Sequence, residues 1–295
     1  MPAQPRRILV VRNPVAGQRR AADYARAIRV FEEAGCSVSV AETTARGDAV
    51  RIAREADTQA FDVVVAAGGD GTINEVVNGL VGGALPLGLI PLGTANVLAH
   101  EVGIGPDARR AAGVILTGRR QPIALANAGG HYCCLMASAG YDARAITRVR
   151  PVLKRLTGEG AYYVAGFEEM LAGTRRLLQV EIDGVAYEAA SVVVANGRLY
   201  GGRYLIAPDA DIREPVLHTI LLQRPGRWNI TRYGIAVMRE RLHLLPDVEI
   251  VKGTTVRLAA PAGEPWQSDG DLIGEFPVDI TVEASAIELM VPGED

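Results

Sequence analysis

The chain has 295 residues, 48% of them hydrophobic and 22% charged, a composition typical of a globular protein long enough for two domains. Its net charge of −3 and its low aromatic content of 5% argue against a dedicated nucleic-acid-binding protein. The only two lysines, Lys154 and Lys252, lie outside glycine-rich turns, which excludes a phosphate-binding loop that depends on lysine.

Hydrophobic strands alternate with helices through about the first 120 residues. Strands are predicted at Arg7–Val11, Ser37–Ala41, Phe61–Ala67 and Leu87–Pro91, and helices at Ala21–Ala34, Asp48–Ala56, Thr72–Val81 and Thr94–Glu101. This alternation predicts an α/β domain with a doubly wound parallel sheet.

The pattern changes after residue 122, where short strands separated by Gly, Pro and Asp turns predict a β-rich sandwich. The predicted strands are Ile123–Ala126, Tyr132–Ala137, Leu178–Ile182, Tyr187–Ala195, Leu217–Gln223, Val248–Val251, Thr255–Ala259 and Asp279–Val282, with helices at Ala161–Leu171 and Asn229–Leu242. We therefore expect a first domain over residues 1–122, rejoined by the segment 285–295, and a second domain over residues 123–284.

Three strand-to-helix turns of the first domain have a composition suited to phosphate binding. They are Asn13 to Gly17, Gly68-Gly69-Asp70-Gly71 before Thr72, and Gly93 before Thr94. Glycines let the backbone approach a ligand closely, and the start of a helix presents unpaired N–H groups to an anion. Such turns open at the carboxyl ends of parallel strands, where ligands bind. A purely structural reading is also available, because Thr72 and Glu75 fit a capping box.

Asp70 favours the functional reading. A carboxylate among phosphate-cradling amides would repel a triphosphate unless a divalent cation lies between them. That arrangement suits phosphoryl transfer, whose catalysis is mostly positioning and charge neutralisation.

The run Gly68–Gly79, GGDGTINEVVNG, resembles the signature of diacylglycerol kinase-type lipid kinases, a family that includes bacterial lipid kinases, sphingosine kinases and ceramide kinases. GGDGT alone also occurs in NAD kinases, whose α/β domain the first domain would resemble. Further segments match the family in order: Asn13-Pro14, Pro91–Asn96, Gly140–Ala143, Asn196–Ala210 and Asp269–Asp271.

The resemblance implies a lipid kinase that uses ATP and Mg²⁺. It places ATP contacts at Asn13, Thr43, Gly68, Gly69, Asp70, Gly71, Thr72, Asn74 and Thr94. Thr44 could take the place of Thr43 after a shift of one residue. The resemblance also implies that Asp269 or Asp271 takes the proton from the lipid hydroxyl. From the residues alone, Asp269-Gly270 is simply a good turn.

The sequence departs from the family pattern at two points. Asp269-Gly270-Asp271 replaces the family's Asp-Gly-Glu, which shortens one carboxylate arm. The family often binds a structural magnesium at an Asp-Gly pair, and here the matching pair is Glu214-Pro215. The implied metal ligands are then Asp211, Glu214 and Val216, in a turn that Pro215 stiffens.

The composition and a basic segment predict where in the cell the protein is located. No stretch reaches 18 apolar residues, and the three cysteines, Cys36, Cys133 and Cys134, are interpreted as small buried thiols in a reducing compartment. We expect a cytoplasmic protein that docks peripherally on the inner face of the membrane. The docking segment is predicted to be a basic run without intervening acidic residues, namely Arg144, Arg148, Arg150, Lys154 and Arg155.

Two alternatives to a lipid kinase stay open at this point. One is a soluble-substrate kinase resembling the NAD kinases, and the other is a non-catalytic nucleotide- or lipid-binding regulator suggested by the altered residues Glu214, Pro215 and Asp271. The lipid substrate itself is not encoded in a motif. A homodimer is possible, and no nucleic-acid partner is expected.

Overall fold

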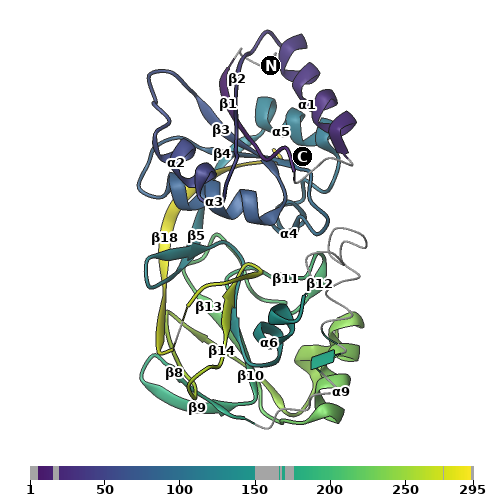
Figure 1. Ribbon diagram of the computed structural model, residues 1–295, viewed down its shortest axis with the longest axis vertical. Helices are drawn as coiled ribbons and strands as arrows, with labels where there is room; N and C mark the ends of the chain where they lie inside the picture. The colour runs from purple at the N-terminus through teal and green to yellow at the C-terminus, as the bar shows by residue number, and fades with distance from the viewer. Residues whose placement is uncertain are drawn as a thin grey trace. The chain divides into compact units, whose positions relative to one another are not determined.

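The computed structural model describes residues 6–15, 20–149, 166, 168–169, 176–274 and 276–293 (Figure 1). The chain separates into two compact units, Met1–Ala124 with Ala284–Asp295 (unit 1) and Leu125–Glu283 (unit 2). Gly17 and most of the helix predicted at 161–171 lie outside the described residues.

Unit 1 is built on a parallel sheet in the order β2-β1-β3-β4, and the end of β18 lies parallel to β4 through Leu289 and Leu87. The strands are β1 (Arg7–Arg12), β2 (Ser37–Glu42), β3 (Val63–Gly68), β4 (Leu87–Pro91) and β18 (Val278–Val291). All of β3 and β4 is buried, as expected for parallel strands covered on both faces.

The helices of unit 1 cover both faces of that sheet. Helices α1 (Ala21–Glu33) and α5 (Ala108–Thr117) pack on the face that carries Ile8, Val10 and Val65, and α2 (Asp48–Arg54) and α3 (Asp70–Leu80) lie on the opposite face (Figure 1). The close α2–α3 approach requires a glycine, since a Cβ on Gly79 would lie 2.5 Å from the Val50 carbonyl oxygen. The doubly wound α/β prediction is confirmed.

Three details of unit 1 differ from the prediction. Helix α3 begins at Asp70 rather than Thr72, and α4 (Val97–Glu101) begins three residues after Thr94. The predicted capping box is wrong, because α3 has no side-chain cap and the Glu75 carboxylate accepts the backbone N–H of Ala49 at 3.2 Å. Helix α5 was not predicted.

Unit 2 is a sandwich of two antiparallel layers. One sheet has the order β14-β13-β10-β7-β16-β17, and the other layer contains β18-β15-β8-β9 with the β5–β6 hairpin. Side chains from both layers form one core, which includes Val180, Val194, Leu221, Val256 and Ile280. The sandwich prediction is confirmed.

The strands of unit 2 are β5 (Arg119–Ala128), β6 (His131–Cys133), β7 (Met136–Ala139), β8 (Leu178–Ile182), β9 (Val185–Ala189), β10 (Ser191–Ala195), β11 (Leu199–Tyr200), β12 (Tyr204–Leu205), β13 (Leu217–Leu222), β14 (Val248–Gly253), β15 (Thr255–Ala259), β16 (Trp266–Ser268) and β17 (Asp271–Leu272), together with part of β18. The helices of unit 2 whose bounds lie within the described residues are α6 (Tyr141–Thr147), α9 (Arg227–Met238) and the short η2 (Leu242–Leu244). The strands predicted at Tyr132–Ala137 and Tyr187–Ala195 are each divided in two, while α6, β11, β12, β16 and β17 were not predicted.

Candidate active site

Two glycine loops of unit 1 touch each other at the carboxyl ends of β3 and β4. A Cβ built on Gly93 would lie only 2.5 Å from the Cα of Gly69, so no side chain fits between the loops at Gly93. Gly68 is equally constrained, because its Cβ would lie 2.5 Å from Oγ1 of the buried Thr72. The glycines are therefore explained first by the packing of one loop on the other.

Asp70 and Asn96 fasten these two loops. The Asp70 carboxylate accepts the backbone N–H groups of Asn96, at 2.9 Å, and Val97, at 2.7 Å, at the start of α4. The Asn96 side chain, only 1% exposed, in turn accepts the N–H of Gly93 and donates to its carbonyl oxygen, each at 2.8 Å. Sequence reasoning missed Asn96 as a site residue, although its left-handed backbone (φ 48°) suits an Asn at a helix start.

The position of Asp70 also affects its protonation. Burial raises the pKa of the Asp70 carboxyl, and the N–H groups of Val97 and Asn96 oppose that rise. Each carboxylate oxygen accepts one of these N–H groups, and a carboxylate has about four acceptor positions in all. The residue thus anchors the second loop and keeps acceptor capacity for a cation.

The other residues predicted to contact ATP lie on neighbouring segments of unit 1. Asn13 follows β1 and donates its N–H to the Ala67 carbonyl of β3 at 3.1 Å. Asn74 and Thr72 are buried in α3, whereas Gly71 and Thr94 are exposed.

The two threonines that could contact ATP, Thr43 and Thr44, differ in burial and in hydrogen bonding. Thr43 is buried, with its hydroxyl 3.4 Å from the Arg12 carbonyl oxygen. Thr44 is exposed and donates its hydroxyl to Asp48 at 2.7 Å. Hydrogen bonds from Thr44 and Ala45 lower the pKa of Asp48 to about 2, so the Thr44 hydroxyl is committed to the start of α2. The ATP role of either threonine remains a prediction.

The second candidate centre lies in unit 2, around Asp269. Its carboxylate accepts three consecutive backbone N–H groups, from Cys134 at 2.7 Å, Leu135 at 3.1 Å and Met136 at 3.0 Å. Asp269 adopts a left-handed backbone conformation (φ 45°) at the tip of the β16–β17 turn. The same three-residue segment is held from its carbonyl side by Asn196, which donates to the Cys134 oxygen at 2.8 Å.

A buried polar network connects this turn to two of the motifs. Asp142, from the Gly140–Ala143 segment, accepts hydrogen bonds from Ser138 and Tyr200. Gln267 donates to Asp142 at 3.0 Å and accepts the Gly270 N–H at 2.7 Å. Segments far apart in the sequence thus meet at the Asp269–Asp271 turn. Gln267 and Ser138 belong to no motif, and sequence reasoning had no signal for them.

The predicted metal ligands form a tight turn in which one carboxylate already has a cationic partner. Asp211 makes an ion pair with Arg213, and this hydrogen-bonded partner lowers the pKa of the Asp211 carboxyl. The Glu214 N–H donates to the Asp211 carbonyl at 2.9 Å, and the Val216 N–H to the Glu214 carbonyl at 2.8 Å. Within the described part of the chain, no group of three or more His, Cys, Asp or Glu residues forms a metal cluster.

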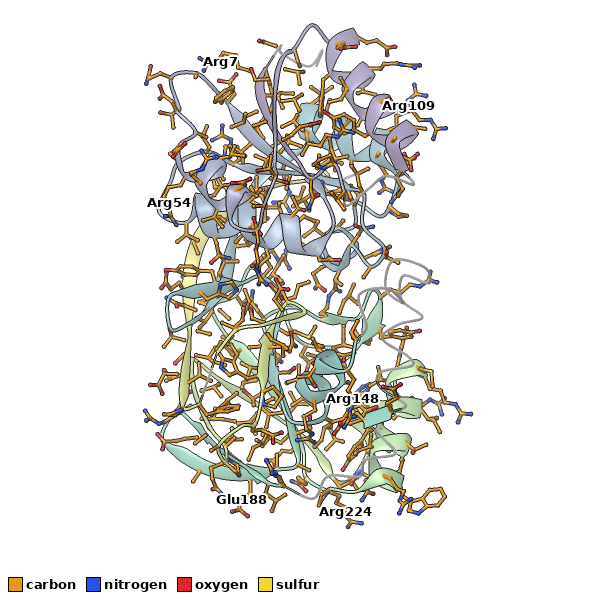
Figure 2. The ribbon with its side chains drawn as sticks, in the orientation of Figure 1. Arg7, Arg54, Arg109, Arg148, Glu188 and Arg224 are labelled. Carbon is orange, nitrogen blue, oxygen red and sulfur yellow. The ribbon has the colours of Figure 1, made fainter. Side chains whose placement is uncertain are left out.

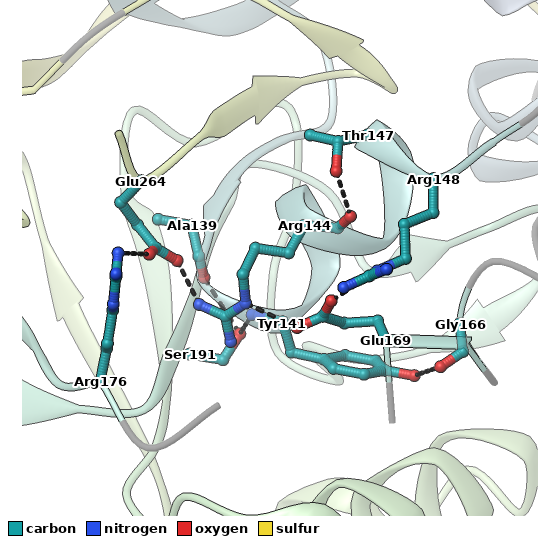
Figure 3. A network of polar contacts seen from close by, with 10 residues as sticks. All are labelled: Ala139, Tyr141, Arg144, Thr147, Arg148, Gly166, Glu169, Arg176, Ser191 and Glu264. Carbon is teal, nitrogen blue, oxygen red and sulfur yellow. Dashed lines mark hydrogen bonds and ion pairs between the residues drawn. The ribbon is translucent and has the colours of Figure 1, made fainter. Parts of the chain in front are cut away.

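The basic run does not present all of its charges to solvent. Arg144 pairs with Glu169 at 2.7 Å and also with Glu264, while Arg148 pairs with Glu169 at 2.8 Å (Figure 3). Both carboxylates are almost fully buried, with side chains 1% and 2% exposed. Together with these carboxylates, Arg144 and Arg148 line a polar hollow of about 340 Å³ within unit 2. Arg150, Lys154 and Arg155 lie outside the described residues.

Two sequence families account for both units. Residues 7–128 match the diacylglycerol kinase catalytic domain, and residues 136–291 match the YegS C-terminal NAD kinase beta sandwich-like domain. A diacylglycerol kinase of Bacillus subtilis (strain 168) is 30% identical over 98% of this chain and 97% of its own length. The chain belongs to the bacterial diacylglycerol kinase and YegS-like lipid kinase family.

Two further similar proteins each cover most of the chain. A "Probable lipid kinase YegS-like" protein of Yersinia enterocolitica is 34% identical over 74% of this chain and 75% of its own length. The crystal structure of a diacylglycerol kinase from Bacillus anthracis superimposes with a TM-score of 0.77 at 21% identity, covering 97% of this chain and 96% of the other. That likeness supports the lipid kinase fold.

Proposed function

We propose that this member of the lipid kinase family transfers the γ-phosphoryl group of ATP to the hydroxyl of a membrane lipid such as diacylglycerol. The observation that carries the proposal is the pair of glycine loops in unit 1, held together by Asp70 and Asn96. The loops bring glycine backbone and the start of the 11-residue helix α3 to the carboxyl edge of a parallel sheet. This is where open α/β sheets bind phosphorylated ligands.

In this proposal unit 1 holds the nucleotide. The absent side chain at Gly71, where a Cβ would face open space, allows a phosphate to approach the backbone, and the helix dipole of α3 attracts its charge. Thr94, exposed beside Gly93, and Asn13, at the end of β1, supply polar groups near the same edge. Unit 2, with its apolar sandwich core, is the proposed lipid domain.

In this proposal Asp70 is a better ligand for Mg²⁺ than Asp211. Asp70 retains acceptor positions and lies in the phosphate-binding loop, whereas Asp211 is neutralised by Arg213. A hard cation prefers carboxylate and phosphate oxygens, so Mg²⁺ bound with ATP would neutralise the triphosphate. A cation held by Asp211, Glu214 and Val216 stays a prediction.

Asp271 is the better candidate for the general base. Three backbone N–H groups stabilise the charged form of Asp269, and such hydrogen bonds reduce the tendency of a carboxylate to take up a proton. Asp269 then positions the turn, while the partly exposed Asp271, two residues along in β17, accepts the proton of the lipid hydroxyl.

The test is a phosphorylation assay with labelled ATP and a panel of acceptors. The panel contains diacylglycerol, a sphingoid base, ceramide, phosphatidylglycerol and NAD, each with and without Mg²⁺. Label transfer to one lipid class, dependent on a divalent cation, is the expected result. Transfer to NAD would establish a soluble-substrate kinase instead. Tight ATP binding without transfer to any acceptor would establish a nucleotide-binding regulator.

A further inference from the structure

Helix α9 of unit 2 is apolar on two sides. Ile230, Tyr233 and Ala236 point into the protein and are buried. The opposite side carries Trp228, Ile235 and Met238, whose exposed fractions are 82%, 41% and 55%. These three lie at spacings of seven and three residues, which places them on one face of the helix. A helix that is apolar on both faces is normally covered on both.

The segment after α9 carries another exposed apolar side chain. Leu244 of η2, which follows α9 after a short turn, is 65% exposed. We call Trp228, Ile235, Met238 and Leu244 the α9 face. Exposed apolar side chains that gather on one helix and the segment after it mark an interaction site more often than scattered ones do.

Arginines flank the residues of the α9 face in the sequence. Residues 223–246 contain five arginines, Arg224, Arg227, Arg232, Arg239 and Arg241, and one acidic residue, Glu240. Arg232 is paired with the buried Asp247, and Arg224, which projects just before α9 (Figure 2), lies 3.8 Å from the same carboxylate. Arg227, Arg239 and Arg241 make no ion pair with any residue that the structure describes, and all three are exposed.

We infer that the α9 face docks the protein on the surface of an anionic lipid bilayer. Exposed tryptophan and long aliphatic side chains insert at the boundary between headgroups and acyl chains, and flanking arginines attract anionic headgroups. The inference rests on the proposed function for its choice of a membrane as the occupant, since the substrate proposed there is a membrane lipid. We prefer the α9 face to the Arg144–Arg155 run because Arg144 and Arg148 pair with buried carboxylates, while the rest of that run lies outside the described residues and stays a prediction.

The test measures binding without ATP and activity separately. Full-length protein is sedimented with vesicles of phosphatidylcholine and phosphatidylglycerol, or of phosphatidylcholine alone, at low and high salt. We expect binding to the anionic vesicles at low salt and release at high salt, since the Debye length falls from about 10 Å at 0.1 M to about 3 Å at 1 M. Trp228 reports insertion directly: the other tryptophan, Trp266, is buried, so a blue shift and quenching by brominated lipids come from the α9 face.

Two variants and two matched controls identify the surface. W228S/I235S/M238S and R227Q/R239Q/R241Q should each weaken vesicle binding at least about 10-fold. The controls remove the same kinds of group elsewhere. V40S/V185S removes exposed apolar side chains, and R54Q/R109Q/R110Q removes exposed arginines of unit 1, of which Arg54 and Arg109 are labelled in Figure 2. The controls should bind like the unchanged protein.

Several outcomes would overturn the inference. Unchanged binding of the two α9 variants, or equal losses in the controls, would place docking elsewhere. A dimer in solution that the serine variant converts to a monomer would show that the face is covered by a second copy. Failure of the proposed function is distinguishable, because phosphorylation of a dispersed short-chain lipid without vesicle binding overturns only the docking. Vesicle binding without phosphorylation of any acceptor overturns only the kinase activity.

Discussion

The carboxylates of Asp70 and Asp269 each join two segments of the chain through hydrogen bonds that their sequence motifs do not indicate. Asp70 stands in the GGDGT motif, yet both of its oxygens accept N–H groups of the neighbouring loop. Asp269 likewise accepts three N–H groups of a segment more than 130 residues away in the sequence. Charge-assisted hydrogen bonds of this kind are about twice as strong as neutral ones. At both positions a side chain that belongs to a sequence motif also holds two segments of the chain together.

The two roles of Asp70 can be separated with Asp70→Asn. The amide can accept one N–H but presents its own NH₂ to the other, so the variant should be less stable by about 1–3 kcal/mol without ATP and with a chelator present. Turnover should fall at least ~100-fold, since the loops and the cation site are both perturbed. Denaturant unfolding with and without Mg²⁺ measures the first effect. Full stability in the chelator would mean that Asp70 serves only the cation.

Replacing Asp269 or Asp271 by asparagine should affect different properties, namely stability for Asp269 and phosphoryl transfer for Asp271. Asp271→Asn is expected to reduce phosphoryl transfer by about 10²–10⁴-fold, because its amide cannot take the proton, while the melting temperature and ATP binding stay unchanged. Asp269→Asn is expected to lower the melting temperature, because three N–H groups lose a charged acceptor. Steady-state kinetics and thermal melts decide between them. A stable, inactive Asp269→Asn protein would reverse the assignment.

At the scale of elements, ion pairs to buried carboxylates hold helix α6 to the rest of unit 2. Arg144 of α6 joins Glu169 to Glu264, and Arg148 adds a second contact to Glu169 (Figure 3). Burial makes these pairs different from the exposed ion pairs of the chain, because an unpaired charge cannot be solvated there.

Arg144→Gln should therefore destabilise the protein by on the order of 3 kcal/mol, since two buried carboxylates lose a partner. Arg257→Gln is the matched control: it breaks the exposed pair with Asp279, with side chains 50% and 59% exposed, and should cost less than about 1 kcal/mol. Urea unfolding at low ionic strength compares them. Similar small losses in both variants would show that the Arg144 network contributes little.

At the scale of the whole molecule, the chain leaves unit 1 within β5 and returns to it within β18. The early part of β18 pairs with β15 in unit 2, and its last residues lie beside β4 in unit 1. Ile287, Leu289, Met290 and Val291 are all buried there. Among the residues described, no helix has the length and hydropathy to cross a membrane.

The end of β18 should consequently be essential for the stability of unit 1. Leu289→Ala removes a fully buried side chain and is expected to cost about 2–5 kcal/mol. Glu288→Ala, at the neighbouring position with an exposed partner in Arg120, should cost less than about 1 kcal/mol. Chemical denaturation followed by circular dichroism provides both values. Equal costs would mean that the contact with β4 is not part of the cooperative core.

The sequence by itself determined the fold class and the place of the first glycine loop. Strand and helix periodicity are local properties, and GGDGT follows a buried strand directly, so both can be read along the chain. Element boundaries were less predictable: Thr72 and Thr94 suggested helix starts that Asp70 and Val97 provide instead.

Only the tertiary structure decided which groups meet. The amides of Cys134–Met136 lie beside Asp269, and Glu264 lies beside Arg144, although 120 residues or more separate the partners. The basic run contains no acidic residue, and the partners of Arg144 and Arg148 are distant in the sequence, so their pairing with buried carboxylates could not be predicted. The exposure of Trp228 was equally hidden, because an apolar residue in a helix points to a core until packing shows which face is left uncovered. Hydrogen bonding and burial depend on distances in space, which spacing along the chain does not encode.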